Sequence, residues 1–486
     1  ALQGARAADW QPGDEAEIFD HTFAEEMWTV DNLTKQIDGK NVTFAVSYVN
    51  HSGAQAFLVA LVNVTDGDYV STLPYQLFGM HYMTPAGQEV FVGAVFAFLL
   101  AYEDTYNGTG PGNNGMPDPG NENVFYVIPF GVGEVFDNRS YRPEVEVLPV
   151  EKLGDGHYRF GMRYRNLYAK IIDANNPLGF LLSLNFPLYI AKFSEFTIVY
   201  DVTIDPASGT MKAETYYSLG QVSDLWVFGI PATRADIPFD FGISVVHYVA
   251  MFTSSYTLED ATGLAVDTGI QRPLDEDLTI RVGDRAERAL QVGFRGTFNL
   301  TDEVTDQRIQ EDTPAYNILV LARPGDLILV RWQAAFSLHL MAAFAFGLSG
   351  EIRGRYDSPT DLILNGSEDF TRAAFWYAVA FPNWRGYRVD HDPTYTAFFA
   401  PAGQEAPAGV NPAGLVALGL AAFVAVAAVF LVRRRRRARA GPEAPDPTEA
   451  DAETKAQAGD DPVVTEDDSG PLPEDDLAWP LEDDFD

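Results

Sequence analysis

Residues 102–125, "YEDTYNGTGPGNNGMPDPGNENVF", hold a dense set of short oxygen-bearing side chains. Calcium loops place Asp and Asn at close spacing, with a Gly at the sharp bend and a carboxylate that closes the coordination shell. With Gly115 at the bend, four residues are candidate calcium ligands: Asp104, Asn114, Asp118 and Glu122. Glycines occupy the positions of the early ligands, so the stretch also fits an exposed Gly/Pro/Asn connection between buried strands. Both interpretations remain open.

The sequence contains no local catalytic signature. None of the seven His residues forms an H-x-H or H-E-x-x-H motif, and G-x-S-x-G, P-loop and G-x-G-x-x-G motifs do not occur. Residues 388–393, "RVDHDP", cluster acids around His391, but we expect a turn there. Paired carboxylates for glycoside hydrolysis need only be close in space. The sequence therefore assigns no catalytic residue and no certain cofactor, and leaves only calcium as a candidate.

Acceptor motifs for N-glycosylation, N-x-S/T, are frequent and unevenly placed. They occur at Asn32, Asn41, Asn50, Asn63, Asn107, Asn138, Asn299 and Asn365. Eight of the 19 Asn residues lie in such a motif, whereas chance would place about two there. We therefore expect a glycosylated surface outside the cell. None lies in 139–298, which suggests that a neighbour or an intermolecular contact screens this segment.

Residues 413–432, "AGLVALGLAAFVAVAAVFLV", form the clearest pattern in the chain. Twenty uncharged residues of helix span about 30 Å, the thickness of a bilayer core. Five consecutive Arg follow at 433–437, and Arg clusters stay on the cytoplasmic side of a spanning helix. The sequence therefore predicts a single-pass plasma-membrane protein, with its lipid contact at 413–432, its N-terminal ectodomain outside and its C-terminal tail in the cytoplasm.

The segments that flank this span are not expected to pack into a core. Residues 401–412 are a Pro/Ala/Gly stalk, which reads as a short tether. The Arg cluster and acidic tail occupy 433–486, and 441–486 carry 17 Asp and Glu against one Lys. Such a composition predicts disorder. The tail is either inert or a docking segment for a cytoplasmic partner.

Charge and composition exclude several classes of protein. The net charge of −36 would repel nucleic acid, so no nucleic-acid partner is expected. The chain has no Cys, which excludes disulfides, thiolate metal sites and Cys nucleophiles. It is 47% hydrophobic and long enough to bury a sizeable core.

The hydrophobic patterns predict a mainly β ectodomain of the β-sandwich type. Residues 41–52 alternate apolar and polar side chains, and 196–222 read as two strands around the turn "DPASGT". Residues 90–102 and 336–348 are apolar on both faces but too short to span a bilayer, so we expect central strands covered on both sides.

Other segments complete this expected fold. Residues 317–332 read as two β-rich runs joined at a Pro-Gly turn, and the aromatic residues of 371–389 are expected to lie in the core. A short helix is expected around 283–291. Weak boundaries divide the ectodomain into three β domains: 1–140, which holds most acceptor motifs, 141–265 and 266–400.

This combination resembles archaeal single-pass cell-surface glycoproteins, including S-layer-like proteins. The resemblance is one of architecture: an acidic, Cys-free, acceptor-rich β ectodomain on a C-terminal anchor. It implies a structural or interaction glycoprotein of the cell envelope, which self-associates or contacts other envelope proteins. An adhesin that binds glycan or peptide is the alternative, and a membrane-tethered enzyme that acts on envelope glycans is the second.

Overall fold

The computed structural model describes most of the expected ectodomain. It covers residues 26–401 except 38–39, 67–68, 73–75, 104–114, 116, 118–121, 133–142, 174, 176, 187, 238–240, 254, 261–262, 264–270, 274–276, 284–286, 294–295 and 321–370. The predicted anchor, the tail, the apolar run 336–348 and most of the stalk lie outside these residues. Within them, the fold is mainly β, as predicted.

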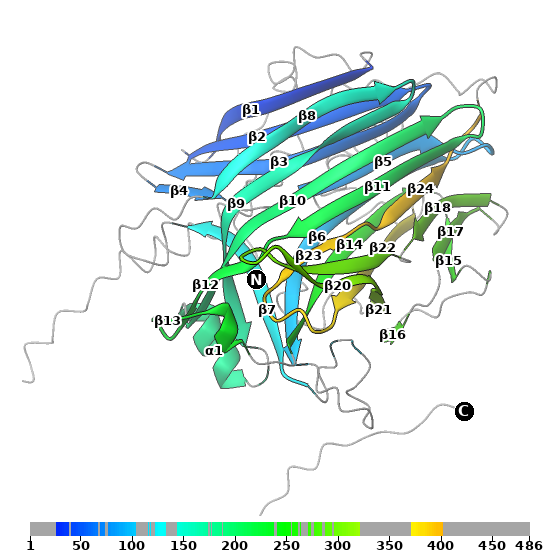
Figure 1. The fold of residues 1–486 in the computed structure, drawn as a ribbon. Helices are drawn as coiled ribbons and strands as arrows, with labels where there is room; N and C mark the ends of the chain where they lie inside the picture. Colours follow the sequence, from blue (N-terminus) through cyan, green and yellow to red (C-terminus); the bar gives the residue numbers. More distant parts are fainter. Residues whose placement is uncertain are drawn as a thin grey trace, which may run out of the picture. The chain divides into compact units, whose positions relative to one another are not determined.

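Antiparallel strands make up two packed layers (Figure 1). The first layer runs in hydrogen-bonded order through β1 (Met27–Ile37), β2 (Lys40–His51), β3 (Ala54–Asp66), β5 (Gln76–Met83), β6 (Glu89–Glu103), β14 (Phe241–Thr253), β22 (Thr371–Phe381), β21 (Tyr316–Val320) and β16 (Gln271–Pro273). Its strands are rich in Val, Phe, Tyr and Ala, which suit a pleated and buried surface.

The second layer is built around two long strands, β9 (His157–Asp173) and β10 (Tyr189–Asp205). Its order is β8 (Glu144–Gly154), β9, β10 and β11 (Thr210–Leu219), followed by β23 (Arg388–His391) and β24 (Thr394–Phe398). Beyond β24 lie β18 (Glu287–Gly293), β17 (Leu278–Val282) and β15 (Tyr256–Asp260), whereas β19 (Thr297–Asp302) and β20 (Gln307–Pro314) lie beyond β23.

A few shorter elements join or extend the layers. β7 (Val124–Val132) pairs with both β6 and β9, and therefore links the first layer to the second. β4 (Tyr69–Thr72) pairs with β3 and β7. The hairpin of β12 (Val222–Val227) and β13 (Ile230–Ala232) extends from β10, and α1 (Pro177–Asn185) connects β9 to β10.

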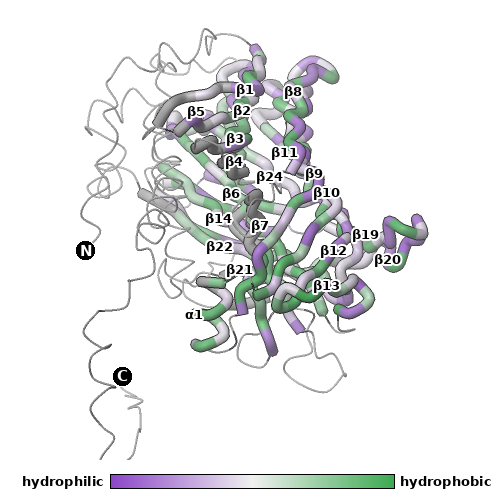
Figure 2. The backbone as a smooth tube through the Cα atoms, turned by 90° about the vertical axis from the view of Figure 1, so that its left-hand side faces the viewer, coloured by the Kyte–Doolittle hydropathy of each residue, from purple (hydrophilic) through white to green (hydrophobic). Residues whose placement is uncertain are grey.

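Aromatic side chains fill the space between the layers. Phe78 of β5 stacks on Tyr200 of β10 with ring centroids 4.3 Å apart, and Phe96 of β6 lies 4.9 Å from Phe196 of β10. Figure 2 shows hydrophobic colouring along β14 and β22 of the first layer. Since large rings dominate the energy of burial, this interlayer packing is the main stabilising feature of the sandwich.

Several sequence-based predictions are confirmed. The segment 196–222 forms β10 and β11 around its predicted turn, and 41–52 falls in β2. The run 90–102 lies in β6, which is buried between β5 and β14. The aromatic residues of 371–389 lie mainly in the core, with Trp376 and Tyr377 almost fully buried. Residues 317–320 of the segment 317–332 lie in β21, whereas 321–332, which include the predicted Pro-Gly turn, lie outside the described residues.

Two predictions were wrong. The helix expected around 283–291 is absent from its described part, where β18 begins at Glu287 and pairs with β17 and β24. The turn expected at 388–393 is largely β23, which lies between β11 and β19. In both cases the neighbouring strands supply ladder hydrogen bonds, which override a weak local preference.

Strand pairing crosses the boundaries that were expected near 140 and 265. β14 of the central segment pairs with β6 and with β22, and β7 pairs with β9. The three segments of the expected division are therefore joined to one another by ladders of hydrogen bonds between their strands.

Candidate functional site

The structure places part of the candidate calcium loop. Gly115 has a φ of +71°, which suits the predicted bend, and its carbonyl accepts a hydrogen bond from the Tyr102 hydroxyl at 2.8 Å. Glu122 is buried just before β7. The other three candidate ligands, Asp104, Asn114 and Asp118, lie outside the described residues. Calcium binding by this loop therefore stays a prediction.

The candidate glycosylation sites that the structure describes lie on strands. Asn32 and Asn41 are exposed, whereas Asn50, Asn63 and Asn299 are half-buried. The Asn299 side chain also accepts a hydrogen bond from the backbone N–H of Asp312 at 3.0 Å. Asn107, Asn138 and Asn365 lie outside the described residues. Among the described sites, Asn32 and Asn41 are therefore the most accessible acceptors.

No cluster of three or more His, Asp or Glu that could hold a metal ion occurs in the part of the chain that the structure describes. His81 is buried and contacts Glu89 at 2.8 Å. His391 of the "RVDHDP" segment is also buried, and its Nδ1 lies 3.0 Å from the carbonyl oxygen of Thr297. Their environment is that of core histidines.

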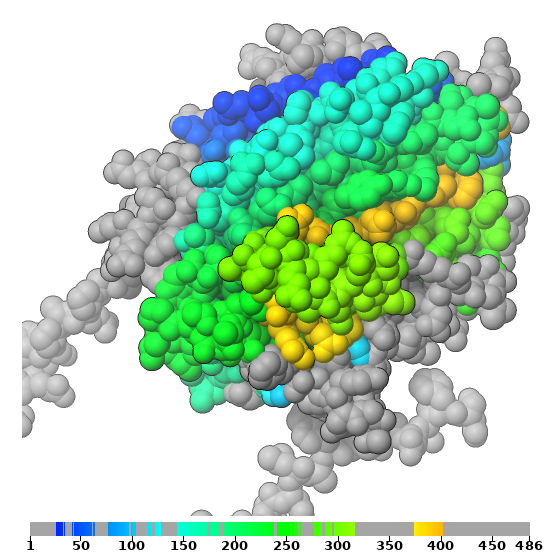
Figure 3. Space-filling model, viewed as in Figure 1, coloured from blue at the N-terminus to red at the C-terminus, as the bar shows by residue number. Residues whose placement is uncertain are grey.

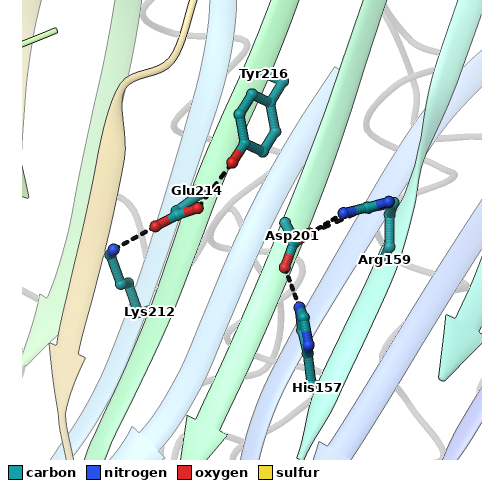
Figure 4. Close-up of polar contacts among 6 residues, drawn as sticks. All are labelled: His157, Arg159, Asp201, Lys212, Glu214 and Tyr216. Atoms are coloured by element: carbon teal, nitrogen blue, oxygen red, sulfur yellow. Dashed lines mark hydrogen bonds and ion pairs between the residues drawn. The ribbon is translucent and has the colours of Figure 1, made fainter. Parts of the chain in front are cut away.

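The most developed polar arrangement is the solvent-facing side of β9, β10 and β11, which we call the outer polar face. Its members are His157, Arg159, Asp201, Lys212, Glu214 and Tyr216 (Figure 4). Side chains alternate across a strand, so every second residue of "HYRFG" and "KAETY" points outward. The register then aligns Arg159, Asp201 and Glu214 across three strands. Figure 3 shows the broad surface of β8–β11 toward the viewer.

Asp201 is the centre of this face. Its Oδ2 accepts hydrogen bonds from Arg159 at 2.5 and 3.1 Å, and its Oδ1 contacts Nε2 of His157. Burial opposes the charged form, but the bonds from Arg159 and His157 outweigh it, so the pKa of the Asp201 carboxyl is lowered. Asp201 is therefore a charged anchor for Arg159 at neutral pH and a hydrogen-bond partner of His157.

Glu214 organises the neighbouring half of the face. It accepts a hydrogen bond from Lys212 and another from the Tyr216 hydroxyl at 2.8 Å. The bond from Lys212 lowers the pKa of the Glu214 carboxyl, and the Glu214 bond raises the pKa of Tyr216 to about 12. Tyr216 is 43% exposed, so its ring is held upright on the surface by a charged partner.

Charges of both signs continue onto β8. Glu146 accepts hydrogen bonds from Arg163 at 3.2 Å and from Arg165 at 2.8 Å. Because Asp201, Glu214 and Glu146 each bond to a base, this part of the face carries no extended field of one sign. Such a surface suits a ligand that offers many neutral hydroxyl or amide groups, rather than a polyanion.

A second polar group lies between the layers and is fully enclosed. This interlayer cluster contains Tyr217, His247, Tyr377, His391 and Tyr395. The ring of His247 stacks on Tyr377 at 4.6 Å, the rings of Tyr217 and His391 lie 5.3 Å apart, and Tyr377 and Tyr395 share a hydroxyl contact. Tyr217 Oη, His247 Nε2 and His391 Nε2 have no hydrogen-bond partner among the described residues.

The electrostatics of the interlayer cluster argue against acid–base chemistry at neutral pH. Burial lowers the pKa of His247 to about 3, with a further effect of His391, and burial lowers the pKa of His391 to about 4. Both imidazoles are therefore neutral at pH 7 and far from the pKa that suits a general acid or base. The cluster is a feature of packing and of acid stability.

Sequence reasoning missed both polar groups. The outward series His157, Arg159, Arg163 and Arg165 has period two and could have indicated a charged strand face. The partners Asp201 and Glu214 come from other strands, and only the register reveals them. The interlayer cluster draws on residues from 217 to 395, so it leaves no local signal.

Among the described residues, no helix has both the length and the hydrophobicity needed to cross a bilayer. The predicted span at 413–432 lies outside the described residues.

Comparisons with known proteins give little. No family model matches the chain, and no curated protein matches it. A solved structure, that of a lysyl oxidase from Pichia pastoris, matches with a TM-score of 0.20 and 9% identity over 80% of this chain and 72% of that chain. A match this weak carries no argument about fold or function.

Proposed function

We propose that this chain is a membrane-anchored interaction protein of the cell surface, similar in architecture to archaeal envelope glycoproteins. The carrying observation is the uncharged run 413–432 followed directly by five Arg. This combination has a physical reason at a bilayer and none in a folded core. The charge pattern sets the sandwich outside and the acidic tail inside.

The sandwich supports a role in interaction. Its polar chemistry, in the part that the structure describes, is arranged as ion pairs on an open strand face and as neutral groups in the interlayer cluster. An open strand face offers area and hydrogen bonds to a partner. An enzyme site would instead gather titratable groups in a concave pocket.

Anchoring is tested with the full chain in its host membrane. After alkaline carbonate extraction, the chain should remain in the membrane pellet, and external protease should remove the sandwich while it spares the acidic tail. A variant with Leu420→Asp and Val424→Asp should move to the supernatant, because charges at the bilayer centre oppose insertion. Recovery of the unmodified chain in the supernatant would contradict the proposal.

Glycan or peptide binding is a second candidate function, favoured by Tyr216. An aromatic ring that is 43% exposed and flanked by hydrogen-bonding groups suits the apolar face and hydroxyls of a sugar. Arrays of glycans and peptides should identify ligands whose binding falls about tenfold with Tyr216→Ala, the loss expected for one aromatic anchor. Ile309→Ala, a similarly exposed apolar position on β20, is the matched control. Equal loss with both variants would reject the outer polar face as the site.

A further inference from the structure

α1 carries large apolar side chains on its solvent side. The helix "PLGFLLSLN" contains no charged residue, and Leu178 and Leu181 are 66% and 55% exposed. Phe186, directly after the helix, is 56% exposed. A helix that only covers a core would turn such residues inward. Figure 2 shows hydrophobic colouring along α1, at the end of the sandwich where β12 and β13 also lie.

The turn of the β12–β13 hairpin shows the same property. Phe228 and Ile230 are 62% and 68% exposed, and they flank Gly229. Phe228 has a φ of +50° and Gly229 a φ of +77°. Asn, Asp or Gly normally fill such positions, and a bulky residue with positive φ is uncommon. An exposed aromatic ring in an unfavourable backbone conformation indicates a function rather than a contribution to the fold.

The helix and the hairpin form one patch, which we call the apolar tip: Leu178, Leu181, Leu182, Phe186, Phe228 and Ile230. The backbone N–H of Phe228 donates to the carbonyl oxygen of Leu188, which follows α1, at 2.6 Å. The ring of Phe228 lies against Tyr189 with centroids 5.2 Å apart. The two protrusions are therefore fixed side by side, as Figure 1 also shows.

The chain beyond the sandwich indicates what covers this tip. Only 11 residues, 402–412, separate the last described residue from the predicted span. Even fully extended, they reach at most about 36–40 Å, so the proposed anchor holds the sandwich close to a bilayer. The tip also lies within 139–298, the segment without glycan acceptors, so the tip itself carries no attachment site for a sugar.

We propose that the apolar tip inserts into the lipid interface of the membrane that anchors the chain. Leu and Phe side chains on short protrusions can bury themselves at the boundary of headgroups and acyl chains without disturbing the sandwich. The inference rests on the proposed anchoring and adds a second lipid contact, made by the folded domain itself.

The position of the tether then defines an orientation. The backbone of Phe399 bonds to Gly209, so the tether leaves beside the turn between β10 and β11. The apolar tip lies at the opposite end of β10, whose 17 residues extend for roughly 50 Å. This separation exceeds the reach of the tether. Both contacts with the bilayer are therefore compatible only when β10 is tilted well away from the membrane normal.

The absence of Cys permits a direct test with single nitroxide labels on the full chain in phosphatidylcholine vesicles. The label at Ile230→Cys should lose broadening by an aqueous nickel chelate and gain broadening by oxygen, which concentrates in lipid. The matched label at Val304→Cys, an aliphatic position that is 82% exposed and outside the apolar tip, should keep its nickel broadening. Adding Phe228→Asp to the Ile230→Cys chain should restore nickel broadening.

The outcomes separate this inference from the proposed anchoring. If the chain floats with the vesicles and the 230 label stays open to nickel, the tip does not insert, although anchoring holds. If the chain fails to float, anchoring itself is wrong, and the inference falls with it. Dipolar broadening between 230 labels, without an oxygen effect, would show that a second copy covers the tip and would overturn the lipid assignment.

Discussion

Tyr216 and Tyr217 are consecutive residues of β11, but the first is exposed on the surface and the second is buried in the core. Tyr216 stands on the outer polar face, where its hydroxyl donates a hydrogen bond to Glu214. Tyr217 is buried between the layers, and its hydroxyl has no partner among the described residues. Both phenols have a raised pKa, but hydrogen bonding to Glu214 is the first cause for Tyr216 and burial for Tyr217. A shift of one residue along the strand therefore decides whether a tyrosine hydroxyl is hydrogen-bonded at the surface or buried in the core at a cost in desolvation.

The contrast extends to the whole of both faces. Outer groups are charged and paired, and water can solvate the partner that remains when one of them is removed, so the loss of stability should be small. Inner groups are aromatic or neutral, and any change there acts on packing and desolvation. The two faces should therefore differ in the size, the pH dependence and the salt dependence of mutational effects.

The largest effect is expected from Phe78→Ala on the inner face. Phe78 is 1% exposed and stacks on Tyr200, so truncation leaves a cavity and removes the ring contact. The free energy of unfolding should fall by about 3–5 kcal/mol, measured by denaturant titration. Val304→Ala, at a position that is 82% exposed, should change it by less than about 0.5 kcal/mol. A loss below about 1 kcal/mol for Phe78→Ala would contradict the interlayer packing.

Acid should reduce the contributions of the two faces to stability in different ranges of pH. His247 and His391 have pKa values of about 3 and about 4 in the fold, below the value near 6.5 of the unfolded chain. As pH falls below about 6.5, the unfolded chain takes up protons that the fold excludes, and each such group lowers stability by up to about 1.4 kcal/mol per pH unit. Paired carboxylates such as Asp201, whose pKa is lowered, lose their contribution only below about pH 4.

His247→Phe tests this window. The variant keeps a ring against Tyr377 but removes one buried base, so the slope of melting temperature between pH 6.5 and pH 4.5 should become shallower. The measurement is a series of thermal melts across that range, with Val304→Ala as the control. An unchanged slope in His247→Phe would show that this histidine is protonated in the fold.

A smaller effect of opposite sign is expected from Tyr217→Phe. Removing a buried hydroxyl that has no partner should stabilise the protein by about 1 kcal/mol, because its desolvation is no longer a cost. Tyr216→Phe is the matched neighbour and should cost at most about 0.5 kcal/mol. Parallel urea titrations of both variants check the pair. A clear loss of stability in Tyr217→Phe would reveal a partner for its hydroxyl beyond the described residues.

A small and salt-dependent effect is expected from Asp201→Asn on the outer polar face. The change removes the charge that holds Arg159 and His157, but both partners are substantially exposed and can be solvated. The loss should be about 0.5–1 kcal/mol at low ionic strength and should largely vanish in 1 M salt. Chemical unfolding at the two salt concentrations measures it. A loss that persists in high salt would show that this ion pair behaves as a buried one.

Local patterns in the sequence predicted the strands that carry their own signal. The run 90–102 is apolar on both faces because β6 is covered on both sides, and "DPASGT" marks the turn between β10 and β11. The sequence did not predict segments whose conformation is set by pairing with neighbouring strands. Residues 283–291 offered a helix-like composition, but β17 and β24 draw residues from Glu287 onward into a ladder.

The candidate site was harder to predict than the fold. Asp201, Glu214 and Arg159 meet because three strands align in register, and this alignment is set by packing on the inner face. α1 was missed because its apolar residues do not form the one-sided stripe that marks a helix on a core. The calcium and glycosylation assignments came from motifs, and they remain predictions.

The pairing of β14 has a consequence for how the protein is made. Its partners are β6, about 150 residues earlier, and β22, about 130 residues later. Likewise, β11 pairs with β24, which lies at the far end of the described chain. Synthesis proceeds from the N-terminus, and long-range strand pairing is slow. The sheet edges of β14 and β11 therefore stay open until residues 371–398 have emerged, shortly before the predicted span. Under the proposed anchoring, folding would be completed beside the membrane, and a chain truncated before residue 371 would present unpaired strands to every neighbour.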